Sequence, residues 1–263
     1  MGTRSLSAPR LVAVEGVRLE AQRISVPQPH GTLVLLHEAL GSVSHWRHFP
    51  VQLAESTGMD VVLYSRQGHG QSEGLPAPRT RQHYQREAAT VLPSILAAFD
   101  VQHPILLGHS EGAAIALLFA VSHPEEVRAL VLESPILVAE PAAAAGMAMA
   151  ERAWQQTDLR ERLARHHRDP DAVFRAWLSI RDSDSLLPAP LRDHWQPLRC
   201  PVLMLRGGHD EYATQLQADS LRGLAPAMEL RVFPEAGHTP HREQSQAVLE
   251  AIAAFVRALP PTP

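Results

Sequence analysis

Short apolar runs that alternate with helical stretches restrict this 263-residue chain to a small set of folds. Strands separated by helices usually pair in parallel, and the helices cross over the faces of the sheet. The segment 10–26 differs, because its apolar residues alternate around Glu15-Gly16, which predicts an antiparallel hairpin. Further strands are expected at 33–37, 60–64, 104–108, 127–132, 202–205 and 229–233. The pattern therefore predicts an α/β protein with a mostly parallel sheet.

Helices are expected between most of these strands. Helical periodicity covers 44–56, 80–99, 111–121 and 244–259. Thr80 is a suitable N-cap for the second helix. Pro93, within that helix, is expected to disturb it, because proline has no backbone N–H to donate.

One long interruption breaks the alternation. Residues 135–197 contain helical, arginine-rich and proline-marked stretches but no convincing strand. An insertion between two late strands would lie over the carboxyl ends of the strands, where α/β proteins bind ligands. We therefore expect a core domain made of 1–134 and 198–263, covered by a helical lid at 135–197.

The composition excludes several functions. The net charge of −4 gives no reason to expect binding to nucleic acid or to an anionic membrane. All 24 basic residues are arginine, which excludes a catalytic lysine and, with the absence of asparagine, indicates a GC-rich bacterial genome. The single cysteine, Cys200, excludes an intrachain disulfide. No signal-like or membrane-spanning run is present, so a cytoplasmic protein is the expectation.

The strongest chemical motif is Gly108-His109-Ser110-Glu111-Gly112, which has the form G-x-S-x-G. An apolar strand precedes it and an apolar helix follows it, which is the context that this motif requires. A sharp turn there would raise the Ser110 hydroxyl above the sheet edge, at a helix N-terminus that favours negative charge. Ser110 is therefore the candidate nucleophile.

A serine hydroxyl needs a general base, and the base needs an orienting partner. Among the 15 histidines, His238 lies in the loop after the last strand, at the same sheet edge as Ser110. Asp210 follows the preceding strand and is the expected acid, in the order Ser, Asp, His. His241 is the rival base, whereas Glu133 and the adjacent Glu211 are the rival acids.

Two backbone N–H groups are expected to stabilise a developing oxyanion. One belongs to Glu111, the residue after the candidate nucleophile. The other is assigned to Ala39, in the loop that follows the strand ending at His37.

These segments together resemble the α/β-hydrolase superfamily across nearly the whole chain. The segments are H-E-A-L-G at 37–41, Y-S-R-Q-G-H-G-Q-S at 64–72, G-H-S-E-G at 108–112, G-G-H-D at 207–210 and A-G-H at 236–238. The resemblance implies an eight-stranded, mostly parallel sheet, a lid inserted after the sixth strand, and catalysis without a metal or organic cofactor. A serine nucleophile, in place of aspartate, argues against the dehalogenase and epoxide-hydrolase branches.

Two positions depart from the family pattern. Glu38 stands where the family often has glycine, and a carboxylate there would disfavour an oxyanion unless it is paired or turned away. Glu111 begins a helix, where its charge is favourable. We expect the substrate pocket to be lined by His37, Glu38, His109, Trp154 and Trp177.

The lid carries a second pattern with two possible meanings. Its basic residues could bind a phosphate or carboxylate, as in an acyl-CoA, or could form a solvated helix face balanced by nearby acids. These residues are Arg152, Arg160, Arg162, Arg165, His166, His167 and Arg168.

The sequence as a whole predicts a serine hydrolase that cleaves a carboxylic ester of a small to medium, fairly apolar substrate through an acyl-enzyme. A thioesterase, a lactonase and a carbon–carbon bond hydrolase would use the same three residues. A non-catalytic receptor on this fold is the alternative from another class. The sequence gives no oligomeric state.

Overall fold

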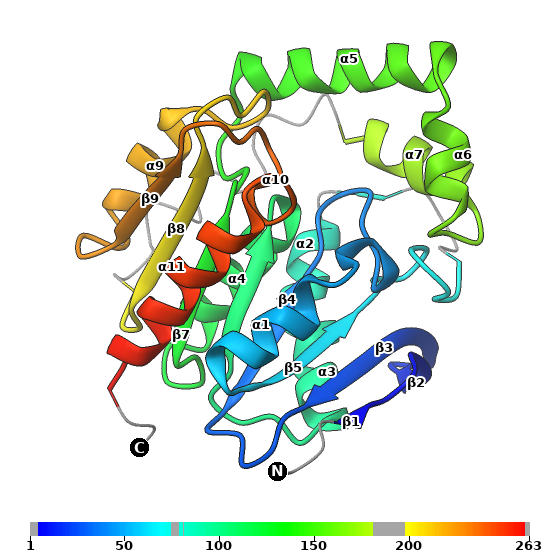
Figure 1. The fold of residues 1–263 in the computed structure, drawn as a ribbon. Helices are drawn as coiled ribbons and strands as arrows, with labels where there is room; N and C mark the ends of the chain where they lie inside the picture. Colours follow the sequence, from blue (N-terminus) through cyan, green and yellow to red (C-terminus); the bar gives the residue numbers. More distant parts are fainter. Residues whose placement is uncertain (1–4, 75–78, 81, 181–197, 261–263) are drawn as a thin grey trace.

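A single mixed sheet forms the centre of the computed structural model, which describes residues 5–74, 79–80, 82–180 and 198–260 (Figure 1). Its strand order is β1-β3-β5-β4-β6-β7-β8-β9, and β2 pairs with β3. The strands are β1 Ser5–Leu6, β2 Arg10–Val14, β3 Val17–Ser25, β4 Thr32–Leu36, β5 Asp60–Tyr64, β6 Ile105–His109, β7 Ala129–Glu133, β8 Val202–Gly207 and β9 Glu229–Phe233.

The pairing confirms the predicted sheet. The first strands run antiparallel, with β2 and β3 forming the predicted hairpin, and every pair from β5–β4 to β8–β9 is parallel. Apart from the two-residue β1, the sheet has the eight mostly parallel strands of the α/β-hydrolase fold.

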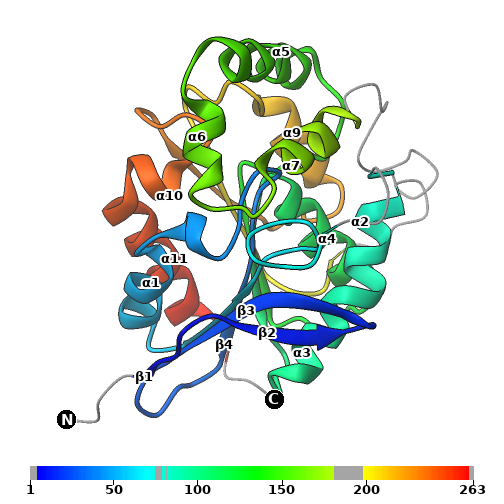
Figure 2. The ribbon, with the colours of Figure 1, turned by 90° about the vertical axis from the view of Figure 1, so that its right-hand side faces the viewer.

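Helices cover both faces of this sheet, which explains why the central strands are apolar without alternation. In β4, Leu33 and Leu35 pack against α1 and α11, whereas Val34 and Leu36 pack against the helices of the opposite face. The two faces are visible in Figure 2. The covering helices are α1 Phe49–Thr57 and α11 Ser245–Ala258 on one face, and α2 Gln82–Arg86, η2 Glu87–Val91, α3 Leu92–Ala98, α4 Glu111–Ser122 and α9 Gln215–Arg222 on the other.

Proline explains two differences from the predicted helices. The stretch expected at 44–56 divides into a 3₁₀ turn, Ser44–Trp46, and α1, whose first turn holds Pro50, a position where no N–H is needed. The second predicted helix contains a π-helical turn, η2, immediately before the segment that holds Pro93. A wide turn of this kind is a common way for a helix to absorb a break in its hydrogen-bond ladder.

The inserted segment after β7 lies beyond the carboxyl ends of the strands, at the top of Figure 1. Its described part holds α5 Pro141–Gln156, α6 Leu159–Ala164 and α7 Pro170–Leu178. Phe174 and Trp177 of this segment pack with Ala39 of the core in a small hydrophobic cluster. The predicted lid continues through 181–197, including Trp195, which lies outside the described residues. Within the described chain, no helix has the length and apolar character needed to cross a membrane.

Candidate functional site

Ser110 lies in a strained turn between β6 and α4. Its backbone has φ 54° and ψ −113°, a conformation that non-glycine residues rarely adopt. Glycines on either side make the turn possible, because a Cβ at Gly108 would collide with the backbone of Gly112, and one at Gly112 would collide with the carbonyl of Leu36. The motif therefore forms the sharp strand-to-helix turn that the sequence predicts.

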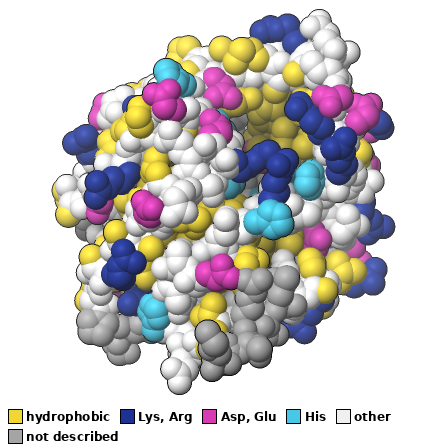
Figure 3. All heavy atoms as spheres, viewed as in Figure 1, with side chains coloured by type: hydrophobic (Ala, Val, Ile, Leu, Met, Phe, Trp, Pro, Cys, Tyr) yellow, Lys and Arg dark blue, Asp and Glu magenta, His cyan; other side chains and the backbone are white. Residues whose placement is uncertain are grey.

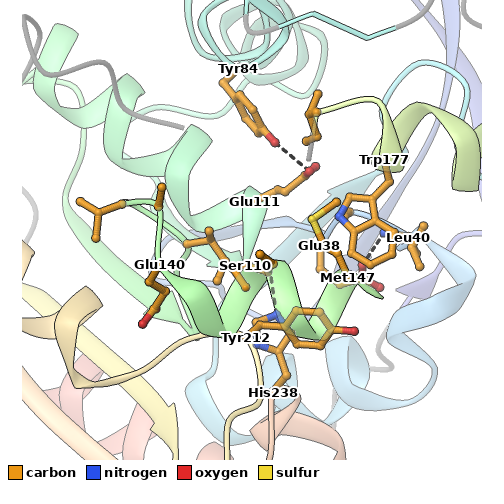
Figure 4. A pocket seen from close by; sticks show the side chains of 17 residues that line it. Glu38, Leu40, Tyr84, Ser110, Glu111, Glu140, Met147, Trp177, Tyr212 and His238 are labelled. Atoms are coloured by element: carbon orange, nitrogen blue, oxygen red, sulfur yellow. Dashed lines mark hydrogen bonds between the residues drawn. The ribbon is translucent and has the colours of Figure 1, made fainter. Parts of the chain in front are cut away.

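Three side chains from separate loops form one hydrogen-bonded chain. His238, in the loop after β9, has its Nε2 3.0 Å from the Oγ of Ser110. The Nδ1 of His238 lies 2.8 Å from Oδ1 of Asp210, in the loop after β8. Because a carboxylate accepts, Nδ1 carries the proton and Nε2 is left to accept from the serine hydroxyl. Figure 4 shows Ser110 and His238 facing each other within the pocket.

Charge and hydrogen bonding shift the pKa values of His238 and Asp210. Burial would lower the pKa of His238, but the hydrogen bond and charge of Asp210 outweigh burial and raise the pKa above its usual value. Burial would also raise the pKa of Asp210, yet His238 and the backbone N–H groups of Tyr212 and Ala213, each 2.9 Å from Oδ1, lower it. Asp210 is therefore a carboxylate at neutral pH.

The rival base and the rival acid pair with each other instead. Glu133, at the end of β7, accepts from the backbone N–H of His241 at 2.7 Å and from its Nδ1 at 2.8 Å. Both side chains are buried, and neither bonds to Ser110 in the described structure. Glu211, the third rival, lies beside Asp210 in sequence but makes no hydrogen bond with His238 among the described residues.

The expected oxyanion donors, Ala39 and Glu111, both line the cavity beside Ser110. Neither backbone N–H donates to an acceptor within the described residues. Arg66 fixes the loop that carries Ala39, because its guanidinium donates to the carbonyls of His37 and Glu38. The assignment of these two N–H groups as oxyanion donors stays a prediction.

The two unusual glutamates of the site are both held by hydrogen bonds. Glu38 accepts from the backbone N–H of Leu40 and lies 3.2 Å from Nδ1 of His45, contacts that outweigh burial and lower its pKa. Glu111 is buried between Arg66 at 3.2 Å, Arg79 at 2.8 Å and the hydroxyl of Tyr84 at 2.7 Å. The contact of Glu111 with Tyr84 is drawn in Figure 4.

A cavity of about 220 Å³ opens beside Ser110 and is walled largely by apolar side chains. The lid helices α5 and α7 and the loops around Ser110 contribute to it. It is lined by Glu38, Ala39, Leu40, Tyr84, Ser110, Glu111, Ile136, Val138, Ala139, Glu140, Ala143, Ala144, Met147, Trp177, Ile180, Tyr212 and His238.

Three of the five residues predicted for the pocket do not line this cavity. His37 is buried behind the loop that carries Ala39, where its Nε2 accepts from the N–H of Arg66 at 3.0 Å. His109 follows Gly108 in the turn, but its Nε2 bonds to the carbonyl of His238 at 2.8 Å. Trp154 stacks on Phe174, with ring centroids 4.1 Å apart, within the lid. Only Glu38 and Trp177 lie where the sequence predicted.

Sequence reasoning missed several residues that shape the site. Tyr212 lines the cavity, and its ring lies 4.7 Å from that of His238. Its position two residues after Asp210 was the available signal. Arg66 was visible only as part of the segment 64–72, whose role the sequence did not specify. Tyr84 gave no signal, because its contacts depend on how distant helices meet.

One group of described residues has metal-ligand atoms close together. Atoms of His109, Glu133 and His241 lie within 4.8 Å of one another. Glu133 accepts from His241, and His109 bonds to the carbonyl of His238, so hydrogen bonds already account for this group.

Two curated proteins match most of this chain. Human monoglyceride lipase is 27% identical over 82% of this chain and 79% of its own length. The 2-succinyl-6-hydroxy-2,4-cyclohexadiene-1-carboxylate synthase of Enterobacter sp. (strain 638) is 27% identical over 86% of this chain and 91% of its own length.

The fold is shared with solved structures. The 2-hydroxy-6-oxo-6-phenylhexa-2,4-dienoate hydrolase of Rhodococcus sp. strain RHA1 superposes with a TM-score of 0.77 at 19% identity, over 97% of this chain and 100% of that one. Residues 27–245 match the family described as serine aminopeptidase, S33. The chain therefore belongs to this family of the α/β-hydrolase superfamily.

Proposed function

We propose that Ser110, His238 and Asp210 form the catalytic triad of a serine hydrolase that cleaves carboxylic esters of small to medium, fairly apolar substrates. The observation that carries the proposal is the continuous chain from Ser110 Oγ through His238 to Asp210, with links of 3.0 Å and 2.8 Å. Both distances fall within the range required for proton transfer from a nucleophile to its base.

The residues support a two-step reaction. His238 Nε2 takes the hydroxyl proton as Ser110 Oγ attacks the ester carbonyl carbon, and the N–H groups of Ala39 and Glu111 stabilise the oxyanion. The intermediate then collapses, and the alcohol leaves with the proton from His238. Water, deprotonated by the same histidine, attacks the acyl-enzyme and releases the acid. Asp210 holds the imidazole in the required tautomer and stabilises the imidazolium.

The cavity supports the substrate class. Its volume of about 220 Å³ exceeds the roughly 150 Å³ of an apolar cavity that binds benzene, so a short acyl chain or one aromatic ring fits. Glu140, one of its carboxylates, is engaged by Thr214 and Gln217. The remaining walls are mostly aliphatic, which favours an uncharged acyl group next to Ser110.

The inserted helices complete the proposed arrangement. We assign 1–134 and 198–263 to the catalytic core and 135–197 to a lid over it. Ala143 and Met147 of α5 and Trp177 of α7 line the cavity from the lid side. Their packing against the core excludes water from the reacting atoms, which strengthens the electrostatic stabilisation there.

A panel of p-nitrophenyl esters with acyl chains of increasing length tests the proposal. We expect hydrolysis with a preference for short to medium chains, and its complete loss in Ser110→Ala while the circular dichroism spectrum stays unchanged. The same assay is run with acyl-CoA, lactone and vinylogous diketone substrates. Comparison of the rates identifies the type of bond that the enzyme cleaves best. A clear preference for one of these would replace the ester assignment, and full activity in Ser110→Ala would overturn the triad.

A further inference from the structure

Two arginines of the core lie near the cavity, and neither forms an ion pair with a carboxylate of the described residues. Arg47 follows the 3₁₀ turn Ser44–Trp46, and Arg242 lies on α10, Pro240–Glu243. Both line a groove of about 550 Å³ between the start of α1 and α10. Figure 3 shows basic and histidine side chains gathered at the edge of a hollow that hydrophobic side chains line.

The groove lies next to the Ser110 cavity. Arg242 also lines a small polar pocket, and Glu38 forms part of the wall of that pocket. Glu38 lines the Ser110 cavity as well, so this one side chain contacts both spaces. Glu38 is therefore a shared wall between the Ser110 cavity and the pocket that Arg242 lines.

Positive charge is concentrated around these two arginines. Burial and the neighbouring Arg47 lower the pKa of Arg242, and Arg162 of the lid acts in the same direction, whereas the charges of Glu38 and Glu243 raise it. His45 bridges core and lid, because its Nε2 lies 3.5 Å from Arg242 Nη1 and its ring is 4.7 Å from that of His166. The contact with His45 is a hydrogen bond that Arg242 donates. Arg47 and Arg242 carry like charges that repel one another, and a bound anion would relieve this repulsion.

The nearest carboxylates do not neutralise this charge by direct ion pairs. Glu243 accepts from the backbone N–H groups of Gly237 at 2.6 Å and Thr239 at 3.2 Å. Glu38 is held by Leu40 and His45. In the described chain, neither Arg47 nor Arg242 forms a salt bridge.

Two arginines of the lid, in contrast, form ion pairs with carboxylates. Arg160 pairs with Asp171 at 2.6 Å, and Arg162 pairs with Asp158 at 3.3 Å. These exposed pairs fit the solvated helix face that the sequence allowed as one of its two interpretations. Arg160 and Arg162 are therefore engaged by carboxylates, in contrast to the two core arginines.

We infer that Arg47 and Arg242 bind an anionic oxygen group, a carboxylate or phosphate, of a substrate whose ester carbonyl reaches Ser110. The inference rests on the proposed ester hydrolysis and narrows its substrate class to esters with an apolar segment between the carbonyl and a terminal anion. Guanidinium groups suit this role, because they bind carboxylate and phosphate with paired N–H donors.

Mono-p-nitrophenyl esters of dicarboxylic acids test the inference against p-nitrophenyl alkanoates of equal chain length. For at least one length, we expect the charged ester to have a tenfold or greater advantage in kcat/KM at low salt. The advantage should fall as salt is added, since the arginines are exposed. It should disappear in the double variant Arg47→Gln/Arg242→Gln, with hydrolysis of the neutral ester unchanged.

Arg222→Gln is the matched control, because Arg222 is an exposed helical arginine on α9, away from both spaces. It should retain the advantage of the charged ester. A phosphonate analogue of the best charged ester shows which anionic group the arginines prefer. If charged esters are poorer at every length, or if their advantage survives in the double variant, the inference is wrong. If the wild-type protein hydrolysed neither the charged nor the neutral esters, the proposed function itself would be wrong.

Discussion

Glu133 holds His241 by two hydrogen bonds, to the backbone N–H and to the imidazole Nδ1, while its own carbonyl accepts from the N–H of Ser110 at 2.9 Å. One residue at the end of β7 thus bonds to the nucleophile turn and to the segment that follows His238. A second link between these segments is the bond from His109 to the His238 carbonyl. We therefore expect Glu133, the alternative acid of the sequence, to position these two segments.

Replacement of Glu133 should weaken both stability and alignment. Glu133→Ala leaves a buried imidazole N–H and a backbone N–H without acceptors, and we expect a loss of about 2–3 kcal/mol in the free energy of unfolding. Glu133→Gln keeps one acceptor oxygen and should lose less. Urea denaturation measures the free energy of unfolding. The kcat of each variant relative to the wild type measures the alignment of His238 with Ser110. If both variants fold and retain the kcat of the wild type, Glu133 does not position the site.

The acid limb of the pH profile should lie at a higher pH than an ordinary histidine gives. His238 must be neutral to accept the serine proton, and its pKa is raised, so kcat/KM should fall as the pH drops through a value above 6.5. The variant Asp210→Asn lacks the carboxylate that raises the pKa of His238, so burial should lower this pKa. The acid limb should therefore move to lower pH. Loss of the oriented tautomer should also reduce kcat by about 10⁴. A limb that stays in place in the variant would contradict this pairing.

Filling the cavity from α5 should shorten the preferred acyl chain. Ala143 lines the cavity, so Ala143→Leu adds three carbon atoms to its wall. We expect kcat/KM for the longest accepted p-nitrophenyl ester to fall by about 10-fold or more, with little change for the acetate.

Ala145→Leu is the control for this change, because Ala145 is exposed on the same helix and does not line the cavity. The chain-length preference should be unchanged in that variant. A similar shift in both variants would show that the preference is not set by this wall.

Local patterns explain why the turn at Ser110 and its contact with His238 could be predicted. The conformation at Ser110 depends on Gly108 and Gly112 in the same turn, so five consecutive residues define it. The order of strands then places the loops carrying Asp210 and His238 at the same sheet edge, as parallel pairing requires.

The rest of the site depends on tertiary packing. Glu133 ends β7 and Asp210 lies in the loop after the neighbouring β8, so the folded loops decide which of them meets His238. Trp154 has the apolar character of a pocket residue, yet the pairing of lid helices turns it onto Phe174. The same holds for Arg47 and Arg242, which are 195 positions apart and meet only in the folded protein.

Labelling with a fluorophosphonate tests the central claim most directly, because only an activated serine reacts rapidly with this reagent. We expect one covalent adduct per chain, located by peptide mass spectrometry on Ser110, and slower labelling in His238→Gln. A folded protein that gains no adduct, or gains it on another serine at the same rate in both proteins, would show that the hydroxyl 3.0 Å from His238 is not a nucleophile.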